Sequence, residues 1–502
     1  MSIRLIQLTR ARQDLDSGIS NVCWTVVVLS SLIIISCAGC SAPGESRSTS
    51  SSQQPGADGL SQRGSELYKT SAAKQMEDQR AAAARIKRLM EAQGLQRHKE
   101  TGQSYYTSYT DIYDWEMYFD GLALAYYGGE EHTMGGLHVF LSRQREDGFI
   151  SRHVLKQKPP AEEGEVARRL YHYESNELCK PFLCQAALIV SRMRGDASWL
   201  GVEDFGRLMR FINCWLTAWD RDGDGLSEWA SAPQSGADTQ LERIGPWESY
   251  YCEGVDINCY LYRELLAAAE LAKALRLPKE VAYFKQQAAR KKERIQALLW
   301  DEKDGCYYSR DRRTGELIRV KDAEMFLPLW AGVATPKQAR LLVSRHLRNP
   351  AEFWTPYPVP SYARSEPHYT QYFKPGPGIP ECFEVEAGHG NWSGSVYPHW
   401  NYLFVHGLED YGFHKEARHI AQVYSEVMRR QPDFYEYYNA ETGDGLGVHP
   451  FWAGATLLLN CLPAELDLHF NPEAIRRVSE KLDFHDIRQE LGIDGSFHPT
   501  VH

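Results

Sequence analysis

Apolar residues recur three and four positions apart along most of the chain from about residue 66 onward, a spacing typical of helices. Several of these segments are apolar around much of their circumference, so we expect them to pack as inner helices. The pattern therefore predicts an all-α domain with few strands. The predicted helices cover residues 76–94, 176–193, 202–220, 257–276, 279–300, 335–347, 399–412 and 415–431.

Long connections rich in aromatic residues, glycine and proline separate the helices; they cover residues 100–114, 228–251, 350–397 and 434–450. Loops of this length inside a compact domain usually carry function. Helical hairpins with elaborate loops on one side predict a toroid of helices with a site at one mouth, and a two-domain helical bundle is the alternative. Because the sequence has no clean internal repeat and no second composition zone, we favour one domain over residues 66–470, followed by a C-terminal extension (471–502).

The N-terminus has the pattern of an export signal. Three arginines precede an apolar run (25–36) that is too short to span a bilayer comfortably, as in the central region of a signal peptide. The residues around Cys37, and more loosely those around Cys40, resemble a bacterial lipobox. We therefore expect a lipoprotein-type signal over residues 1–40, with an uncleaved membrane anchor as the alternative. The Ser/Gln-rich stretch 41–65 has almost nothing to bury and is expected to be a tether. The prediction is an exported protein, lipid-anchored to a bacterial membrane and facing the periplasm or the cell exterior.

Composition narrows the possible partners. The chain has 502 residues, 43% of them hydrophobic, and a net charge of −10, whereas nucleic-acid binding requires a basic face. Its 28 Tyr and 13 Trp are compatible with ligand stacking or with core packing. Eight of the eleven cysteines lie beyond the leader without a short metal-binding spacing, so disulfides and buried thiols both remain open. A small-molecule partner fits this composition, and the oligomeric state stays open.

One carboxylate stands out among aromatic residues. Glu436 lies in FYEYYNAETGDGLG (434–447), between pairs of aromatic side chains and just before a glycine-rich run. Aromatic neighbours are typical of core packing or of sugar stacking, and sugar hydrolysis requires two carboxyl groups, one as acid and one as base or nucleophile. Composition alone does not choose the pair. The loop carboxylates are Glu116, Asp220, Asp222, Asp224, Asp238, Glu248, Glu253 and Glu436.

Five segments in the correct order resemble glycoside hydrolase family 63, especially its short members similar to mannosylglycerate and glucosylglycerate hydrolases. Family 37 trehalase is a related family. The resemblance covers about residues 100–460, and each segment is weak alone while the ordered set is specific. The segments are DWEMYF (114–119), DGDGLSEW (222–229), VDINCYLYRELLAAAELAKAL (255–275), NWSGSVYPHWNYLFVHGL (391–408) and FYEYYNAETGDGLG (434–447).

The resemblance implies an (α/α)6 barrel, a six-hairpin toroid, and an inverting mechanism. The family's general base falls on Glu436 and its general acid on Asp238 in QSGADTQ. Because shielding from water raises the pKa of a carboxyl group, which suits an acid, we expect Asp238 to be the more shielded of the two. The implied substrate is a short α-linked glucoside or mannoside, of the glycosylglycerate or α-disaccharide type. No cofactor is required for this chemistry. Expected substrate contacts are Tyr113, Trp115, Glu116, Trp392 and Tyr397.

Three interpretations compete with this one. A trehalase-like α-glucosidase is the rival among hydrolases. A surface lipoprotein that binds sugar without turnover would keep the cleft and lose the chemistry. A sugar epimerase would depend on histidine bases, for which His389, His399 and His449 are available, although we expect these to line the pocket or serve structure.

The sequence also departs from the family's pattern. Glu116 stands where the family usually has Asp, and Lys180 stands where Gln is common before proline. In NWSGSVYP, Ser393 and Tyr397 replace the family's Arg and second Trp. These changes keep the catalytic pair intact and leave the natural sugar open.

The loop DRDGDGLSEW has a second interpretation, as a calcium site. Asp220, Asp222 and Asp224, followed by Gly225, repeat the first half of a calcium-binding loop, with oxygens at alternating positions and a glycine for the tight turn. The twelfth position is Ser231 instead of Glu, so a closing ligand must come from elsewhere. A structural calcium ion and a plain polar turn are both compatible with the loop.

Overall fold

The structure is a computed structural model whose described residues all belong to one compact unit of the chain, 60–502. The predicted signal, tether and C-terminal extension, with Cys37, Cys40 and His389, lie outside the described residues. In the described part, helices predominate and the strands form only small two- and three-stranded sheets, as the apolar pattern predicts. The structure describes residues 81, 84–86, 88–108, 112–125, 129–154, 176–245, 248–371 and 392–454.

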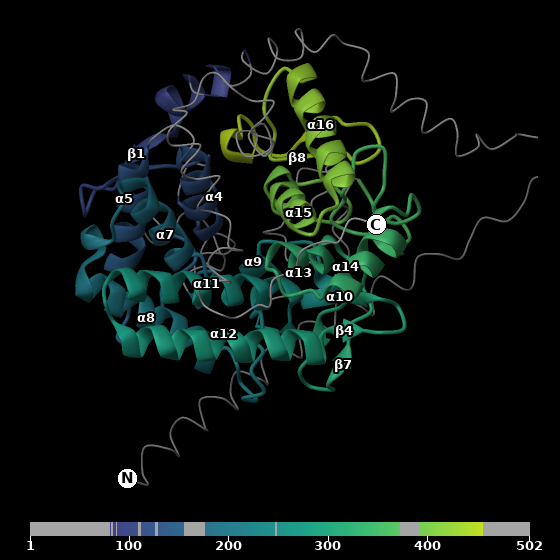
Figure 1. Cartoon of the computed structure of the whole chain (residues 1–502). Helices are drawn as coiled ribbons and strands as arrows, with labels where there is room; N and C mark the ends of the chain where they lie inside the picture. Colours follow the sequence, from purple (N-terminus) through teal and green to yellow (C-terminus); the bar gives the residue numbers. More distant parts are fainter. Residues whose placement is uncertain are drawn as a thin grey trace, which may run out of the picture. The chain divides into compact units, whose positions relative to one another are not determined.

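Ten helices carry most of the described fold (Figure 1). They are α4 (Asp114–Ala125), α5 (Glu130–Ser142), α7 (Leu183–Arg194), α8 (Gly201–Thr217), α11 (Val255–Ala274), α12 (Pro278–Leu298), α13 (Leu327–Trp330), α14 (Pro336–Leu341), α15 (Pro398–Asp410) and α16 (His414–Arg430). Shorter turns are α9 (Ala232–Ser235), α10 (Leu241–Ile244), the 3-10 helices η3 (Ser198–Leu200) and η4 (Ala323–Phe326), and the π-helices η1 (Met90–Gly94) and η5 (Leu342–Leu347). The strands are β1 (Leu95–Arg97), β2 (Ser104–Tyr106), β3 (Cys252–Glu253), β4 (Trp300–Asp301), β5 (Cys306–Tyr307), β6 (Arg310–Asp311), β7 (Glu316–Leu317), β8 (Tyr437–Tyr438) and β9 (Gly445–Leu446).

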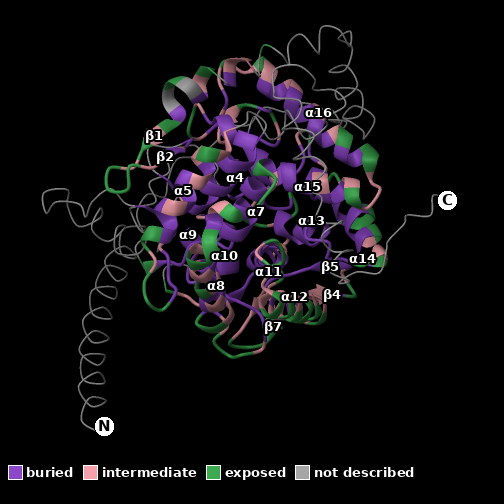
Figure 2. Ribbon diagram, turned by 60° about the vertical axis from the view of Figure 1, so that its left-hand side comes forward, coloured by how far each residue is buried: buried purple, intermediate pink, exposed green. Residues whose placement is uncertain are grey.

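Helices that are buried on all sides alternate along the chain with helices that bury one face. All 12 residues of α4 and 17 of the 20 in α11 are buried, whereas α12 buries only 4 of its 21. Those four α12 residues are Phe284, Ala288, Lys291 and Ile295, one stripe at helical spacing. Likewise, α15 buries 10 of 13 residues and α16 buries 9 of 17. Figure 2 shows the same division between buried and exposed ribbon. Inner and outer helices therefore alternate along the described chain, and α4 with α5, α11 with α12 and α15 with α16 pack as pairs.

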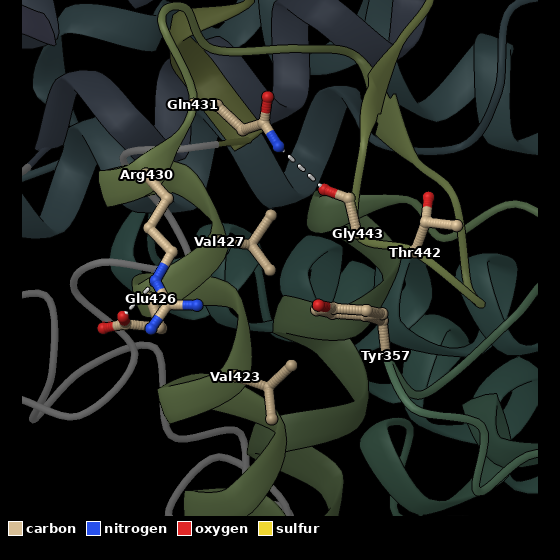
Figure 3. A pocket seen from close by; sticks show the side chains of 8 residues that line it. All are labelled: Tyr357, Val423, Glu426, Val427, Arg430, Gln431, Thr442 and Gly443. Atoms are coloured by element: carbon tan, nitrogen blue, oxygen red, sulfur yellow. Dashed lines mark hydrogen bonds and ion pairs between the residues drawn. The ribbon is translucent and has the colours of Figure 1, made fainter. Parts of the chain in front are cut away.

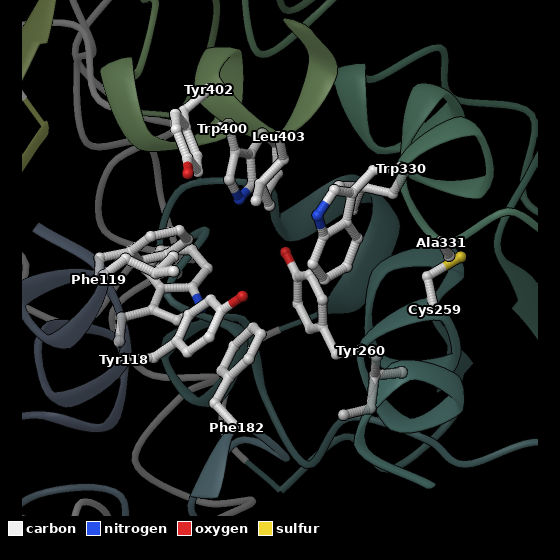
Figure 4. Packing of buried hydrophobic residues seen from close by; sticks show 14 of the residues in the cluster. Tyr118, Phe119, Phe182, Cys259, Tyr260, Trp330, Ala331, Trp400, Tyr402 and Leu403 are labelled. Atoms are coloured by element: carbon white, nitrogen blue, oxygen red, sulfur yellow. The ribbon is translucent and has the colours of Figure 1, made fainter. Parts of the chain in front are cut away.

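The inner helices contact one another in chain order: α4 packs on α7, α7 on α11, α11 on α13 and α13 on α15. Aromatic side chains from α4, α11, α13 and α15, and from Phe182 just before α7, meet in the core (Figure 4). The Phe182 ring, which precedes α7, stacks on Tyr118 of α4 at 4.3 Å and lies 4.7 Å from Tyr260 of α11. Tyr260 in turn lies 6.0 Å from Trp330 of α13. These large rings supply much of the apolar area that holds the helix pairs together.

The segments that lead into the inner helices follow local rules. The predicted helix 176–193 starts only at Leu183, because Pro181 disfavours a helical residue before it and has no N–H to donate. The new N-terminus is satisfied from another helix, where the Glu264 carboxylate accepts hydrogen bonds from the N–H groups of Cys184 (2.6 Å) and Gln185 (3.1 Å). The other predicted helices that lie within the described residues are confirmed to within a few positions, and 335–347 is divided between α14 and η5.

Two further differences separate the structure from the predicted pattern. The predicted loop 228–251 contains two four-residue helices, α9 and α10, and its Trp229 forms a backbone bridge with Cys252 of β3. The periodicity also did not single out α4 or α5. Since α4 is buried on every side, it has no polar face to reveal its period. No helix among the described residues combines the length and apolar character that crossing a bilayer requires.

Candidate active site

Asp238 lies in the turn between α9 and α10, and a glycine in the left-handed region shapes that turn. Ser231 caps α9, its hydroxyl accepting a hydrogen bond from the Gln234 N–H at 3.0 Å. Gly236 ends α9 with φ +79°, the left-handed region that favours glycine. The chain then turns, and Asp238 is left partly exposed between buried neighbours.

Glu436 lies between α16 and β8, also partly exposed. Its backbone N–H donates to the Val448 carbonyl at 2.9 Å, and its Oε2 accepts from the Val448 N–H at 3.1 Å. The hairpin of β8 and β9 pairs Tyr437 with Leu446 and so holds the two ends of this loop together. The carboxylate is therefore fixed at a hairpin, with two of the flanking tyrosines in the small sheet.

Both loops contact one segment, residues 392–397. The hydroxyls of Thr239 and Ser393 lie 2.9 Å apart. Val396 and Tyr438 exchange backbone hydrogen bonds of 2.8 and 2.9 Å. The loop of Asp238 and the loop of Glu436, about two hundred residues apart in sequence, are thus both attached to this short segment.

Aromatic rings from the same segment and from α4 cluster beside the two loops. Trp392 stacks on Tyr397 with ring centroids 3.5 Å apart and an angle of 2°. Trp115 lies 5.5 Å from Trp392 and 5.2 Å from His399. The predicted ring residues Trp115, Trp392 and Tyr397 therefore lie together, although stacking covers one face of Trp392 and one of Tyr397, so that face is closed to a sugar in this structure.

Charged residues surround Asp238. Although part of the Asp238 surface is exposed, the protein packed around it removes most of its hydration, and this burial raises its pKa to about 7; the cations of Arg152 and Lys180 oppose the rise, and the carboxylates of Glu436 and Glu177 add to it. That Glu436 acts on the pKa of Asp238 is a consequence of the two loops meeting at one segment. A carboxyl group with a pKa near neutrality can hold a proton at physiological pH and give it up in a reaction.

Glu116, the predicted hydroxyl contact, lies on α4 beside these charges. Burial raises its pKa to about 7, with Asp114 adding to the rise. Among the described residues, its Oε2 has no hydrogen-bond partner, and the same holds for Trp115 Nε1 and His399 Nε2. Leaving buried polar atoms without partners is costly. These three atoms are therefore positions where a hydroxyl group of a bound sugar, or a water molecule, would form a hydrogen bond.

Tyr113 lies slightly apart from this cluster. Its ring stacks on His153 with centroids 3.9 Å apart, and the Arg152 guanidinium lies 5.5 Å from its centroid. Arg152 also pairs with Glu177 at 3.4 Å. Tyr113 therefore borders the charged side of the site, next to a cation that acts on Asp238.

Sequence inspection did not single out Arg152 or Glu177, and it noted Lys180 only as a departure from a family pattern. Burial raises the pKa of Glu177 to about 7, and its Oε1 accepts a hydrogen bond from the Ser231 hydroxyl that caps α9. Neither residue lies in a recognisable motif. Only the tertiary contacts reveal them: Arg152, after α5, pairs with Glu177, before α7, and Glu177 contacts the cap of α9.

The three aspartates of the predicted calcium loop converge. Asp220, Asp222 and Asp224 each offer a carboxylate oxygen within 4.8 Å of the other two, a spacing that suits oxygen ligands around a calcium ion. Basic side chains also reach the loop. Arg310 Nη1 lies 2.6 Å from Asp224 Oδ2 and 2.7 Å from Glu253 Oε2. The residues thus fit a calcium ion, and they also have protein cations beside them.

Glu253 and the described histidines are weaker candidates for the chemistry. Glu253 is buried against Arg310. His399 is buried among aromatic rings, and burial lowers its pKa to about 3, while His449 is exposed and lies 4.9 Å from the Tyr435 ring. The third histidine that an epimerase could use, His389, lies outside the described residues.

A pocket of about 150 Å³ lies elsewhere, between α16 and the loop after β8 (Figure 3). Its polar groups already bind one another: Arg430 Nε pairs with Glu426 at 2.5 Å and Gln431 donates to the Gly443 carbonyl at 3.0 Å. Tyr357 and two valines supply its apolar wall. Since none of the candidate carboxylates lines it, this pocket is not the site.

The described residues thus form a helical fold in which two candidate carboxylates lie on loops that contact one segment, beside a cluster of aromatic rings. Residues 109–453 match the model of the family described as "Mannosylglycerate hydrolase MGH1-like glycoside hydrolase domain". The chain belongs to this family of glycoside hydrolases, a group within family 63 that is related to trehalase.

Individual proteins similar to this chain include mannosylglycerate hydrolases and trehalases. The chain is 29% identical over 215 residues to a mannosylglycerate hydrolase of Rubrobacter radiotolerans, a match that covers 42% of this chain and 43% of the relative. It is 29% identical over 135 residues to a cytosolic neutral trehalase of Pyricularia oryzae, 22% of this chain and 18% of the relative. The matched segments thus span less than half of these relatives' lengths. The crystal structure of the family 63 mannosylglycerate hydrolase from Thermus thermophilus in complex with Tris superposes with a TM-score of 0.58 at 20% identity, over 75% of this chain and 99% of that one, and shows the shared fold.

Proposed function

We propose that this chain is an inverting glycoside hydrolase that cleaves a short α-linked glucoside or mannoside, of the glycosylglycerate or α-disaccharide type. Asp238 serves as the general acid and Glu436 as the general base. Asp238 protonates the leaving oxygen while Glu436 removes a proton from the attacking water on the opposite face of the sugar. Trp115, Trp392, Tyr397, Glu116 and Tyr113 form the surrounding substrate site.

The observation that carries the proposal is the environment of Asp238. Its raised pKa of about 7 suits a proton donor, and one cause of the rise is the carboxylate of Glu436. The orphaned polar atoms of Trp115 and Glu116 beside it are suited to sugar hydroxyls. Family membership makes glycoside hydrolysis the expected chemistry for such a pair.

The same proposal extends to the fold: the helix pairs belong to an (α/α)6 barrel. Five inner helices in chain order, α4, α7, α11, α13 and α15, support this architecture, and three of them pack against the helix that follows: α4 on α5, α11 on α12 and α15 on α16. The site residues come from segments near the starts of inner helices and from the loops between them, as a site at one mouth requires. An experimental structure with a closed ring of six inner helices would establish the barrel.

The decisive experiment incubates the purified protein with α-disaccharides, including trehalose, and with mannosyl- and glucosyl-glycerate. Released monosaccharide is followed by proton NMR, which also gives the anomer formed first. We expect hydrolysis with inversion of the anomeric configuration. In inverting enzymes the two carboxyl groups lie roughly 6.5–9.5 Å apart, which leaves room for the attacking water, whereas in retaining enzymes they lie closer together. A product with retained configuration would therefore refute the roles assigned to Asp238 and Glu436.

The same panel tests the rivals. Cleavage of trehalose alone would identify a trehalase-like α-glucosidase. Sugar binding in calorimetry without turnover would identify a silent sugar-binding lipoprotein. Interconversion of reducing sugars would identify an epimerase.

We also propose that the protein is exported and carries a lipid on Cys37 or Cys40 after cleavage of its signal. The support is the apolar run that precedes a lipobox-like sequence and the polar stretch that follows it. Metabolic labelling with palmitate is expected to label the native chain and not a C37S/C40S variant. An unlabelled native chain would exclude lipidation.

A further inference from the structure

Lys180 is a fully buried lysine beside the candidate site. Its ammonium and the carboxylate of Asp114 are both 0% exposed, with Lys180 Nζ 3.0 Å from Asp114 Oδ1. Asp114 also accepts hydrogen bonds from the backbone N–H groups of Lys180 (2.8 Å) and Trp115 (2.9 Å). These contacts hold the ammonium of Lys180 in place, because moving it away from Asp114 would leave a buried charge without its partner.

This pair is connected to the Asp238 turn through Trp115. Lys180 Nζ lies 4.5 Å from the centroid of the Trp115 ring, a cation–π distance. The same ring presses on Gly236, where an added Cβ would stand 2.8 Å from Trp115 Cζ3. Gly236 precedes Asp238 by two residues. The contacts therefore run from the ammonium to the ring, and from the ring to the turn that carries the candidate acid.

Charges from several elements face Asp238. Arg152 follows α5, Glu177 and Lys180 precede α7, and Glu436 precedes β8. Arg152 pairs with Glu177, and Lys180 pairs with Asp114 of α4. Since the opposite charges within each pair partly cancel, removing one member changes the field at Asp238.

We propose that Lys180 is a positioning residue for the candidate acid: its ammonium, fixed by Asp114, holds the Trp115 ring against the Gly236 turn that leads to Asp238. From this position the positive charge of Lys180 also favours the ionised form of Asp238. The proposal rests on the role of Asp238 in the proposed function. A glutamine at position 180, which is common in the family's pattern, would keep a hydrogen-bonding side chain but lack the positive charge. The proton affinity of Asp238 should therefore differ between this chain and a protein with glutamine at that position.

The first test measures the proton affinity of Asp238 without a substrate. The melting temperatures of the wild type and Asp238→Asn are compared from pH 4.5 to 9, and the same comparison is made between Lys180→Gln and the Lys180→Gln/Asp238→Asn double variant. Because the pKa of Asp238 is higher in the folded chain than in the unfolded chain, the difference in melting temperature within each pair falls as pH rises. It levels off at the folded-state pKa of Asp238. We expect this levelling pH to be about one unit higher in the Lys180→Gln background, the lower end of the effect of a nearby opposite charge.

Two controls separate this effect from general destabilisation. Lys291 is also a buried lysine, bonded to Asn258 Oδ1 at 3.0 Å and Ser227 Oγ at 3.2 Å. Lys291→Gln should lower the melting temperature and leave the levelling pH of Asp238 unchanged. Lys180→Arg keeps the charge and should show the wild-type levelling pH. If Lys180→Gln does not fold, the neutral pair Asp114→Asn/Lys180→Gln replaces it, and its levelling pH should be higher than that of Lys180→Arg.

The second test uses turnover on the substrate found in the panel. Lys180→Gln should lower kcat about tenfold, since a misplaced ring shifts the acid, and should move the alkaline limb of the pH profile upward. Full activity in Asp238→Asn would refute the proposed function. An inactive Asp238→Asn together with an unmoved levelling pH and unchanged kcat in Lys180→Gln would overturn the role of Lys180 alone.

Discussion

Replacing Gly236 by alanine tests how tightly the candidate acid's turn is packed. The glycine has φ +79° and ψ −5°, and its N–H donates to the Pro233 carbonyl at 3.0 Å. A Cβ at this position would stand 2.8, 3.0 and 3.1 Å from three atoms of the Trp115 ring. Ordinary contacts are several tenths of an ångström longer. The ring is buried, so the ring or the turn has to move.

The cost has two separable parts. Placing an L-residue in the left-handed region costs roughly 1–2 kcal/mol. Overpacking a rigid buried ring adds roughly 1–3 kcal/mol. We therefore expect Gly236→Ala to lower the free energy of unfolding by about 2–5 kcal/mol, the sum of these two parts. Because the displaced ring lies beside Asp238, turnover should also fall by about tenfold or more.

Gly195 supplies a matched control. It ends α7 with φ +84° and ψ −1°, nearly the same backbone, and a Cβ there would meet nothing within 4 Å. Gly195→Ala should show only the backbone cost. Urea denaturation and turnover are measured for both variants and for Trp115→Phe/Gly236→Ala, whose smaller ring should recover part of the stability. If Gly236→Ala is no less stable than Gly195→Ala, the ring does not press on the turn and the reasoning fails.

Three further predictions concern carboxyl groups of the structure. Asp238→Asn and Glu436→Gln should each lower turnover on the order of a hundredfold or more, and wild-type activity should fall as pH rises above about 7, where Asp238 loses its proton; two fully active variants would refute the pair. Asp322 caps η4 and lies 3.1 Å from Arg243 Nε; burial raises its pKa to about 7, and the Arg243 cation opposes the rise. The contribution of the protonated group to stability should therefore be complete below about pH 4 and lost as pH rises to about 7, so the melting temperature should fall less with pH in Asp322→Asn, and equal slopes would contradict the shift. If the aspartate loop 220–224 holds calcium, a chelator should lower the melting temperature, whereas an unchanged melt would mean that Arg310 and its neighbours satisfy the carboxylates.

The sequence by itself determined the helices whose period is visible. The stripe of buried residues on α12 and the one-sided burial of α16 follow from apolar spacing, because an outer helix must bury one face and solvate the other. The candidate pair came from the family resemblance, in which Asp238 and Glu436 fall on the family's acid and base, and it stays a prediction. The family followed from five such motifs in order.

Tertiary structure decided what depends on contacts between distant segments. The start of α7 at Leu183 is satisfied by Glu264 of α11, a partner that no local pattern indicates. α4 was missed because burial on all sides removes the polar face that makes a helix visible in sequence. Two of the charges that set the proton affinity of Asp238, Arg152 and Lys180, reach it only because the segments after α5 and before α7 meet its turn. A pKa depends on burial and on neighbouring charges, and both are properties of the packed chain.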